Sequence, residues 1–431
     1  MTNPEIGQRT AENGKRKTSN TIAFCLVASL FLCWGVANNM NDTLIAAFKR
    51  IMSMTDLQSS LVQFSFYGAY FCVSLPAAYF ISRYSYKAGI LLGLALYAAG
   101  TMLFYPAGEV GSYLFFLIAI YVMAAGCAVL ETTANPYILS MGSRESATRR
   151  LNLAQTLNPP GAIIGILISR HFILSELQDA DATARADMSG AALAAIQNRE
   201  LTAISSTYLI IGCVLLVLLA IMVFALPSRE AHRSKQASGI TGKTLKRLWD
   251  NRIYRYGVAA QFFYVGAQTC VWSFTIRLTM SELGMLEKDA SMIFLYSILD
   301  FTFFRFFLTW LMKYVRPPKL LWCASALAIV LTLMVVLLHG WMAIIALIGI
   351  SGCMSLMFPT IYGTALEDVG MEDAKPAASG LIMAILGGAL ITPLQALLSD
   401  AYGISNSFLI PLICFAVILI YSGYAKGDDG C

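Results

Sequence analysis

The sequence predicts an all-α membrane protein with twelve transmembrane helices arranged as two six-helix bundles. Of its 431 residues, 58% are hydrophobic and only 13% are charged, a composition that soluble domains of this length do not have. Apolar runs of roughly 20 residues, the length needed to cross a bilayer, recur between charges, prolines and glycines. One long polar stretch separates six of these runs from the other six.

The six spans before the polar stretch are predicted to form an N-terminal bundle, residues 21–227, which follows a polar tail at residues 1–20. Their approximate bounds are 21–47, 58–82, 88–106, 112–140, 150–174 and 203–227. The basic stretch 228–254 is predicted to be a cytoplasmic linker. The C-terminal bundle, residues 255–425, precedes a short tail, 426–431, and its spans are 255–281, 290–314, 319–339, 341–366, 376–398 and 404–425.

A short internal repeat supports two related halves. The end of the second span, 78–87, has a counterpart in 308–316 at the end of the eighth, and each pairs a cation with a tyrosine. Most of the 30 lysines and arginines fall in the tails, the linker and the loops after even-numbered spans. This bias predicts a multi-pass membrane protein with both termini cytoplasmic. It also explains the net charge of +5 without a nucleic-acid partner.

The first span contains a polar cluster that includes Asn38, Asn39 and Asp42. Asp42 lies four residues after Asn38 and three after Asn39, so a helix places all three around one side. Bilayer hydrocarbon offers these groups no water, so they must face a cavity or another helix. A carboxylate with amide neighbours can bind a proton and a polyhydroxylated solute. The alternative is that the cluster only bonds neighbouring helices.

The fourth and fifth spans carry the second polar constellation. Glu131 and Asn135 are one turn apart on one face, and a glutamate at membrane depth is rarely kept without a task. Asn152, Gln155 and Asn158 recur every three residues along one stripe. Amides donate and accept hydrogen bonds, as sugar hydroxyls do, so this stripe predicts a polar wall for a neutral solute. Structural hydrogen bonds between spans are the alternative for both groups.

The predicted counterpart wall in the second half is more apolar. Gln261, Tyr264 and Gln268 recur at three and four residues in the seventh span. Three aromatic side chains suit either stacking on the C–H face of a sugar or packing between helices: Trp272, Phe358 and Tyr362.

The eighth span contains two charged residues, Asp300 and Arg305. Five residues correspond to about 140° around a helix, so the two side chains should not face each other. Asp300 is either a third protonatable site or a polar contact outside the cavity.

These motifs together resemble those of the L-fucose/proton symporter family within the major facilitator superfamily. The resemblance covers nearly the whole chain and rests on Trp34 to Asp42 (WxxANNxND), Leu130 to Pro136 (LETxANP), Arg150 to Asn158 (RxNLAQTxN), Gln261 to Thr269, Phe358 to Ile361, Gly387-Gly388 and Thr392-Pro393. At the end of the second span, Arg83, Tyr84 and Lys87 match the superfamily signature. Ala78 replaces its glycine and Ser82 its acid, which puts the acid's interhelical salt bridge in doubt.

The resemblance implies the major facilitator fold and a sugar site between the two halves. Glu131 would contact the sugar and carry a proton, and Asp42 would be a second protonatable group that couples proton movement to the conformational change. Asn39, Gln155 and Asn158 would be wall residues, and Arg305 matches an arginine of the family pattern.

The predicted function is therefore proton-coupled import of a sugar, L-fucose or a related hexose, by alternating access. The expected partners are the sugar, protons and the bilayer, and the two-bundle design works as a monomer. The proton is the expected coupling ion, with no other cofactor and no metal, since the cysteines form no CxxC pair. The sequence contains neither a GxSxG nor an HExxH motif, so these motifs give no indication of an enzyme. A sugar uniporter or exchanger without proton coupling and a non-transporting sugar sensor are the alternatives.

Overall fold

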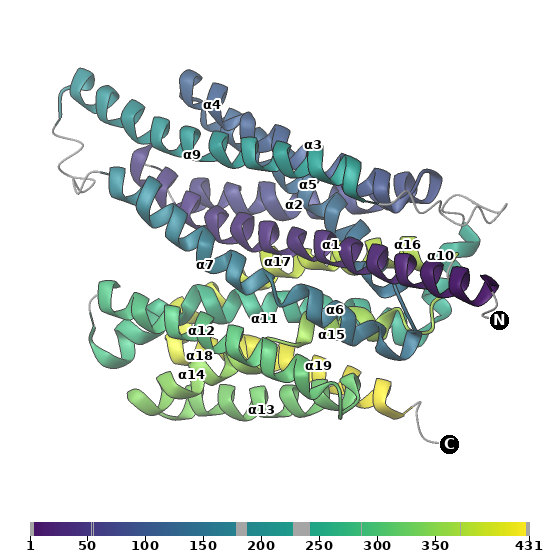
Figure 1. The fold of residues 1–431 in the computed structure, drawn as a ribbon. Coiled ribbons are helices and arrows are strands. Elements are labelled where there is room, and N and C mark those ends of the chain that lie inside the picture. The colour runs from purple at the N-terminus through teal and green to yellow at the C-terminus, as the bar shows by residue number, and fades with distance from the viewer. Residues whose placement is uncertain are drawn as a thin grey trace.

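The structure, a computed structural model, describes residues 4–52, 54, 56–177, 188–226, 242–285, 287–370 and 372–427. Nearly all of these residues are helical, and the described ranges contain no strand. The helices lie side by side in two layers: the N-terminal half, purple to teal, forms one, and the C-terminal half, green to yellow, forms the other (Figure 1). The short helix α10 and both chain ends lie at one end of the molecule, here called the termini end (Figure 1).

The helices of the N-terminal half are α1 (Pro4–Ile51), α2 (Asp56–Arg83), α3 (Tyr86–Met102), α4 (Phe104–Val110), α5 (Tyr113–Ser140), η1 (Arg144–Ser146), α6 (Ala147–Gln155), α7 (Asn158–Ile168), η2 (Ser169–Ile173), η3 (Leu174–Glu176) and α9 (Gly190–Ala225). Those that follow are α10 (Gly242–Asp250), α11 (Arg252–Leu283), α12 (Glu287–Leu311), α13 (Pro317–Leu337), α14 (Trp341–Met354), α15 (Met357–Ala365), α16 (Ala374–Met383), η4 (Ala384–Leu386), α17 (Gly387–Tyr402), α18 (Ile404–Ser407) and α19 (Leu409–Gly427).

Every predicted span corresponds to one of these helices or to a broken pair of them. Eleven stretches are long and apolar enough to cross a membrane by length and composition. The predicted seventh span, α11, is not among them because Gln261 and Gln268 dilute its apolar character, but its 32 residues are ample for a crossing.

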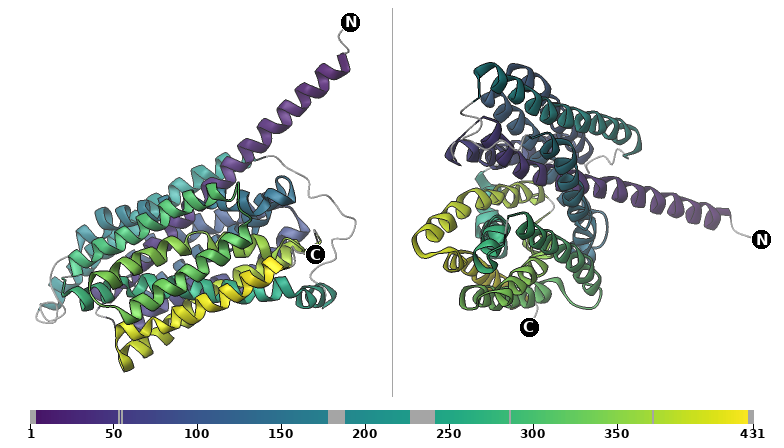
Figure 2. Two further views of the ribbon diagram at one scale, coloured as in Figure 1. Left: turned by 90° about the horizontal axis from the view of Figure 1, so that it is seen from below. Right: turned by 90° about the vertical axis from the view of Figure 1, so that its left-hand side faces the viewer.

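Two helices extend well beyond their predicted spans. The sixth span was expected at 203–227, yet α9 begins at Gly190, where the Ser189 side chain accepts a hydrogen bond from the Ala192 N–H. The added segment is rich in alanine and other good helix formers but contains polar residues, so a search for apolar runs passes over it. In the same way α1 begins at Pro4, and its first part projects beyond the bundle (Figure 2).

Five of the crossings are broken rather than continuous, and in two of them the interruption is a single residue, Leu103 between α3 and α4 and Phe408 between α18 and α19. The break between α6 and α7 comes just before the Pro159-Pro160 pair, where the tandem prolines were expected to loosen the helix, and α7 starts with proline in its first turn. The α14–α15 break precedes Pro359, and α16 is joined to α17 through η4. The breaks within α6–α7 and α16–α17 fall in corresponding helices of the two halves, which is what an internal repeat produces.

The far end of the C-terminal half is held by Glu282, which lies beyond the predicted seventh span. It accepts hydrogen bonds from the Gly340 N–H at 2.9 Å and the Ser405 hydroxyl at 2.8 Å, and it lies 3.4 Å from His339 Nδ1. Burial opposes ionisation, but these hydrogen bonds outweigh it and lower the pKa of the carboxyl below its usual value.

We expect a Glu282→Gln variant to be less stable than the wild type at pH 7 by about 1.5–3 kcal/mol, the usual contribution of hydrogen bonds to a charged group. Because the folded pKa lies below the unfolded one, the stabilisation is complete above the unfolded value and disappears as the pH falls through the folded value. Thermal unfolding in detergent at pH 7 and in the acid range measures this. An equal deficit at both pH values would show that the charge is irrelevant.

Candidate functional site

The polar stretch of α1 contains one residue that joins α1 to another helix and two asparagines that are not fully buried. The Trp34 indole N–H donates to the Cys127 carbonyl of α5 at 3.2 Å, which fixes α1 against α5. Asn39 is partly buried and donates to the Gly35 carbonyl at 3.1 Å, whereas Asn38 is exposed. Asp42 belongs to α1, and its side chain lies outside the described part of the structure.

Glu131 and Asn135 lie on α5 as predicted, one turn apart. Glu131 is partly buried and interacts with the hydroxyl of Tyr70, a fully buried residue of α2. Asn135 is buried, and its Oδ1 accepts a hydrogen bond from Gln155 Nε2 at 3.2 Å. Residues of α2, α5 and α6 thus form a connected polar patch around the carboxylate of Glu131.

Asn158 lies at the start of α7, immediately after the break that follows α6. Its side chain donates to the Phe31 carbonyl of α1 at 3.4 Å, so it joins α7 to the polar helix α1. Asn152 is on the buried side of α6, and its Nδ2 donates to the Thr148 carbonyl at 3.0 Å and to Thr360 Oγ1, in the other half, at 3.2 Å. The predicted amide stripe therefore has its outer member, Asn152, at a contact between the halves and its inner members near Glu131 and α1.

Two glycines allow α1 and α7 to cross at backbone contact. A Cβ on Gly35 would lie 2.1 Å from the Asn158 carbonyl oxygen, and one on Gly161 would lie 2.1 Å from the Leu32 carbonyl oxygen. Such close approach is typical of helix pairs in membranes, which lack a hydrophobic driving force and pack through small residues. The position of Asn158 is therefore set by glycine on α1.

Aromatic side chains of the C-terminal half pack on one another and reach the patch through Tyr362. The Tyr362 and Phe358 rings are stacked with centroids 6.5 Å apart, and Tyr264 meets Phe358 edge-on at 6.1 Å. The Tyr362 hydroxyl is buried close to Asn135, with which it interacts, and makes no hydrogen bond of normal geometry in the described structure. Tyr362 is thus a residue of the second half that faces the Glu131 patch.

Other predicted wall residues of this half have partners inside it. The Tyr264 hydroxyl donates to the Met354 carbonyl at 3.1 Å, which ties α11 to the end of α14. Trp272 Nε1 donates to the Ser351 hydroxyl at 3.3 Å, and the Trp272 ring meets Phe301 edge-on at 5.2 Å. Gln268 is partly buried on α11.

Asp300 and Arg305 point to different sides of α12, as their spacing predicts. Arg305 is 3% exposed, its guanidinium lies 5.1 Å from the centre of the Phe301 ring, and its Nε and Nη1 have no partner among the described residues. Asp300 packs directly on Gly352 of α14, where an added Cβ would lie 2.5 Å from its Oδ2.

Several buried polar atoms of the predicted wall residues make no hydrogen bond of normal geometry within the described structure. They include Nδ2 of Asn135, the hydroxyl of Tyr362, Oδ1 of Asn152 and both polar atoms of Gln261. Buried donors and acceptors are normally satisfied, so these atoms are available to a polar solute or to water. A ligand with several hydroxyls supplies the donors and acceptors that such a lining needs.

At the termini end the two halves are closed against each other. Helix α16 packs on α2 and α5, and α15 packs on α6. The Lys375 ammonium of α16 donates to the Ile81 carbonyl, in the last turn of α2, at 2.8 Å and lies 5.1 Å from the centre of the Tyr86 ring. On α15, Gly363 packs so closely on Thr148 that a Cβ there would lie 2.6 Å from the threonine hydroxyl.

We expect a Lys375→Met variant to open the termini end more often. A cation on the last carbonyls of a helix interacts favourably with its dipole, and a charge-assisted hydrogen bond contributes about 1.5–3 kcal/mol, so the open population should rise about tenfold or more. Spin labels at the exposed Tyr84 and Asp368, in a cysteine-free background, would report this as a longer distance between the halves.

The matched control for this experiment is Lys87→Met. Lys87 donates to the Val223 carbonyl at 2.7 Å, a similar contact of a lysine with a helix end, but within the N-terminal half. An unchanged distance distribution in Lys375→Met, or an equal change in the control, would mean that Lys375 does not hold the halves together.

Sequence reasoning missed Tyr70 and Lys375. Tyr70 is one of several aromatic residues in an apolar span, and only the packing of α2 on α5 brings it to Glu131. In the sequence, Lys375 was interpreted as one of the positive charges that mark the cytoplasmic loops. The replacement of the signature acid by Ser82 put an interhelical salt bridge in doubt, but it did not indicate the contact that Lys375 makes with α2.

Comparisons with known proteins agree with this geometry. The sequence matches the profile of the Major Facilitator Superfamily over residues 23–385. It is 40% identical over 412 residues to the L-fucose-proton symporter of Haemophilus influenzae, covering 93% of this chain and 95% of that protein. It is 34% identical over 395 residues to the glucose/galactose transporter of Brucella abortus, covering 91% of each. The crystal structure of the transporter FucP "in the outward conformation" matches with a TM-score of 0.86 at 37% identity, covering 94% of this chain and 99% of that one.

Proposed function

This chain belongs to the Major Facilitator Superfamily and, within it, to the family of the L-fucose-proton symporters, and we propose that it imports a sugar together with a proton by alternating access. The observation that carries the proposal is the Glu131 patch. A membrane carboxylate, partnered by Tyr70 and one turn from Asn135, faces the junction of the two halves. L-fucose or a related hexose is the proposed substrate.

The proposed roles follow the positions of the side chains. Asp42 and Glu131 are the protonatable groups that couple transport to the proton gradient. The proposed sugar contacts are Asn39, Glu131, Asn135, Gln155, Asn158, Gln268 and Tyr362. Further contacts, closer to the helix packing of the second half, are Asp300, Arg305, Tyr264, Trp272 and Phe358.

Coupling would arise from the cost of burying a charge. When the halves close over the site from both sides, an ionised Glu131 loses its water, which is expensive unless a proton neutralises it. A protonated Glu131 with bound sugar can pass through this closed state, whereas an ionised Glu131 with bound sugar can pass only at much greater cost. The empty site, which keeps water beside the ionised carboxylate, returns without the proton. The carrier therefore moves sugar and proton together.

The state described here is proposed to be outward-facing. Its halves meet at the termini end through α15 and α16, and the positive-inside bias assigns that end to the cytoplasm. Both termini are then cytoplasmic, in a plasma membrane of the bacterial inner-membrane type. One chain contains both halves of the site, so the monomer is the proposed working unit.

Proton movement on addition of sugar tests the proposal. De-energised cells or proteoliposomes that contain the protein should alkalinise a weakly buffered outer medium when L-fucose, or the hexose that is carried, is added. Sugar entry without alkalinisation would favour a uniporter or exchanger. Sugar binding without entry would favour a sensor.

A further inference from the structure

The helix α10 has an outer face that no described part of the protein covers. Leu245 is 54% exposed and Trp249 is 68% exposed, and both lie on the same side of the helix. Its inner side is different: Thr244 and Leu248 are buried against the protein. An apolar face containing tryptophan on a short helix beside a membrane-spanning segment is typical of a helix that lies in the membrane interface.

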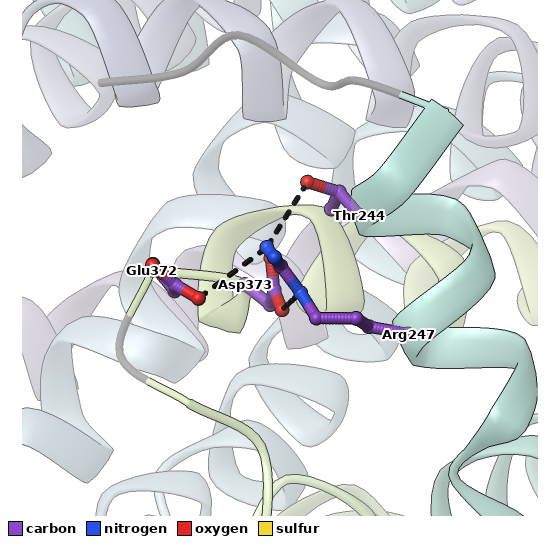
Figure 3. A network of polar contacts seen from close by, with 4 residues as sticks. All are labelled: Thr244, Arg247, Glu372 and Asp373. Carbon is purple, nitrogen blue, oxygen red and sulfur yellow. Dashed lines mark hydrogen bonds and ion pairs between the residues drawn. The ribbon is translucent and has the colours of Figure 1, made fainter. Parts of the chain in front are cut away.

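The inner side of α10 is clamped to the start of α16. Arg247 donates from Nε and Nη2 to the two carboxylate oxygens of Asp373, each at 2.7 Å, and its Nη2 lies 3.4 Å from Glu372 (Figure 3). Thr244 completes this network (Figure 3). This bidentate pair fixes the rotation of α10, so Leu245 and Trp249 must point away from the bundle.

The neighbours of Trp249 are an arginine and aromatic side chains of the kind found at membrane interfaces. The Arg255 guanidinium lies 5.5 Å from the centre of the Trp249 ring and 5.3 Å from that of Tyr256, and it donates to the Trp249 carbonyl. Tyr256 meets Tyr424 of α19 edge-on, and both tyrosines are about two-fifths exposed at the ends of spanning helices. Trp249 thus continues a belt of aromatic side chains at the termini end.

Positive charges surround this exposed apolar face. Lys243 and Lys246 are exposed on α10, and Arg252 follows it at the start of α11. Within the described structure neither lysine forms an ion pair with an acidic side chain, and the acid on α10 is Asp250. Basic clusters next to a spanning helix attract the anionic head groups of the inner leaflet.

We propose that α10 is an interfacial helix that binds anionic phospholipid head groups. Leu245 and Trp249 enter the boundary between head groups and acyl chains, while Lys243 and Lys246, together with Arg252 and Arg255, contact the phosphates. Arg247 is engaged by Asp373 and serves to hold the lipid-binding helix against α16. The proposal does not depend on which solute the protein carries.

Quenching of tryptophan fluorescence by brominated lipids tests the proposal in the intact protein. The protein is reconstituted in phosphatidylcholine bilayers that contain the same mole fraction of brominated phosphatidylglycerol or brominated phosphatidylcholine. The difference between the wild type and Trp249→Phe isolates the Trp249 signal. We expect this signal to be quenched more strongly by the anionic lipid, and the preference to weaken as salt is raised.

The double variant Lys243→Gln/Lys246→Gln should reduce the preference for the anionic lipid about tenfold or more. Lys313→Gln/Lys319→Gln, which removes one exposed lysine between α12 and α13 and another in the first turn of α13, is the matched control and should leave it unchanged. Equal quenching by both lipids in the wild type would overturn the anionic preference. Absence of a Trp249 signal with either lipid would show that α10 faces water or a soluble partner, which would also overturn the proposal.

Discussion

Glu131→Gln is expected to abolish accumulation of sugar while leaving exchange of sugar across the membrane in place. A charge that moves through 100 mV gains about 2.3 kcal/mol, which corresponds to accumulation of about 50-fold. Without a carboxyl to carry the proton, the internal and external sugar concentrations should become equal. Glutamine keeps the shape and the hydrogen-bonding capacity of the site, so counterflow of labelled against unlabelled sugar should continue.

The pair of assays separates loss of coupling from loss of folding. Glu109→Gln is a suitable control, because Glu109 is an exposed acid of the same half on the short helix α4. If Glu131→Gln accumulates sugar as the wild type does, Glu131 does not carry the coupled proton. If it loses counterflow as well, the carboxylate is needed to bind the sugar or to fold the protein, and the coupling role would be left to Asp42.

The second large effect is expected for Gly35→Val, which places a bulkier side chain where α1 and α7 cross. The new side chain would meet backbone atoms, the Asn158 carbonyl oxygen at 2.1 Å and the Ala162 nitrogen at 2.7 Å, which cannot move aside alone. Overpacking of this kind costs about 1–3 kcal/mol or more. The helices must separate, which displaces Asn158, so sugar affinity should fall about tenfold or more, the factor that about 1.4 kcal/mol represents.

The control for this change is Gly68→Val in α2, where an added Cβ meets nothing within 4 Å. Sugar binding and thermal unfolding, both measured in detergent, distinguish a displaced site from an unfolded protein. If Gly35→Val proves too unstable to purify, Gly35→Ala makes the same contact with less bulk. Normal affinity in either purified variant would mean that the crossing does not position Asn158.

Much of the architecture was predictable because a membrane imposes strong rules on sequence. Apolar runs, the charge bias and the proline pair at Pro159 predicted the twelve crossings and the break between α6 and α7, and the major facilitator fold is confirmed. The extension of α9 back to Gly190 was not predicted, because the residues of that segment favour a helix without forming an apolar run. Hydropathy detects burial in lipid, and it does not detect helix beyond the bilayer.

The site was predictable on the N-terminal half and much less so on the other. Carboxylates and amides are costly in a bilayer, so Glu131, Asn135 and Gln155 stood out, and the structure brings them together. The helical spacing of Tyr264 predicted a wall residue. In the structure its hydroxyl donates a hydrogen bond to the Met354 carbonyl, at the break between α14 and α15. Aromatic periodicity alone does not distinguish packing from binding, and only tertiary contacts reveal which ring faces the cavity.

Uptake of labelled sugars into energised proteoliposomes, with and without a protonophore, tests the central claim most directly. The panel should contain L-fucose, glucose, galactose and an amino sugar. Proton-coupled sugar symport predicts that one of them, L-fucose first, accumulates above its external concentration and that the protonophore abolishes the accumulation. Equilibration that the protonophore does not change would contradict proton coupling, and uptake of none of the sugars by folded protein would contradict the assignment of a sugar substrate.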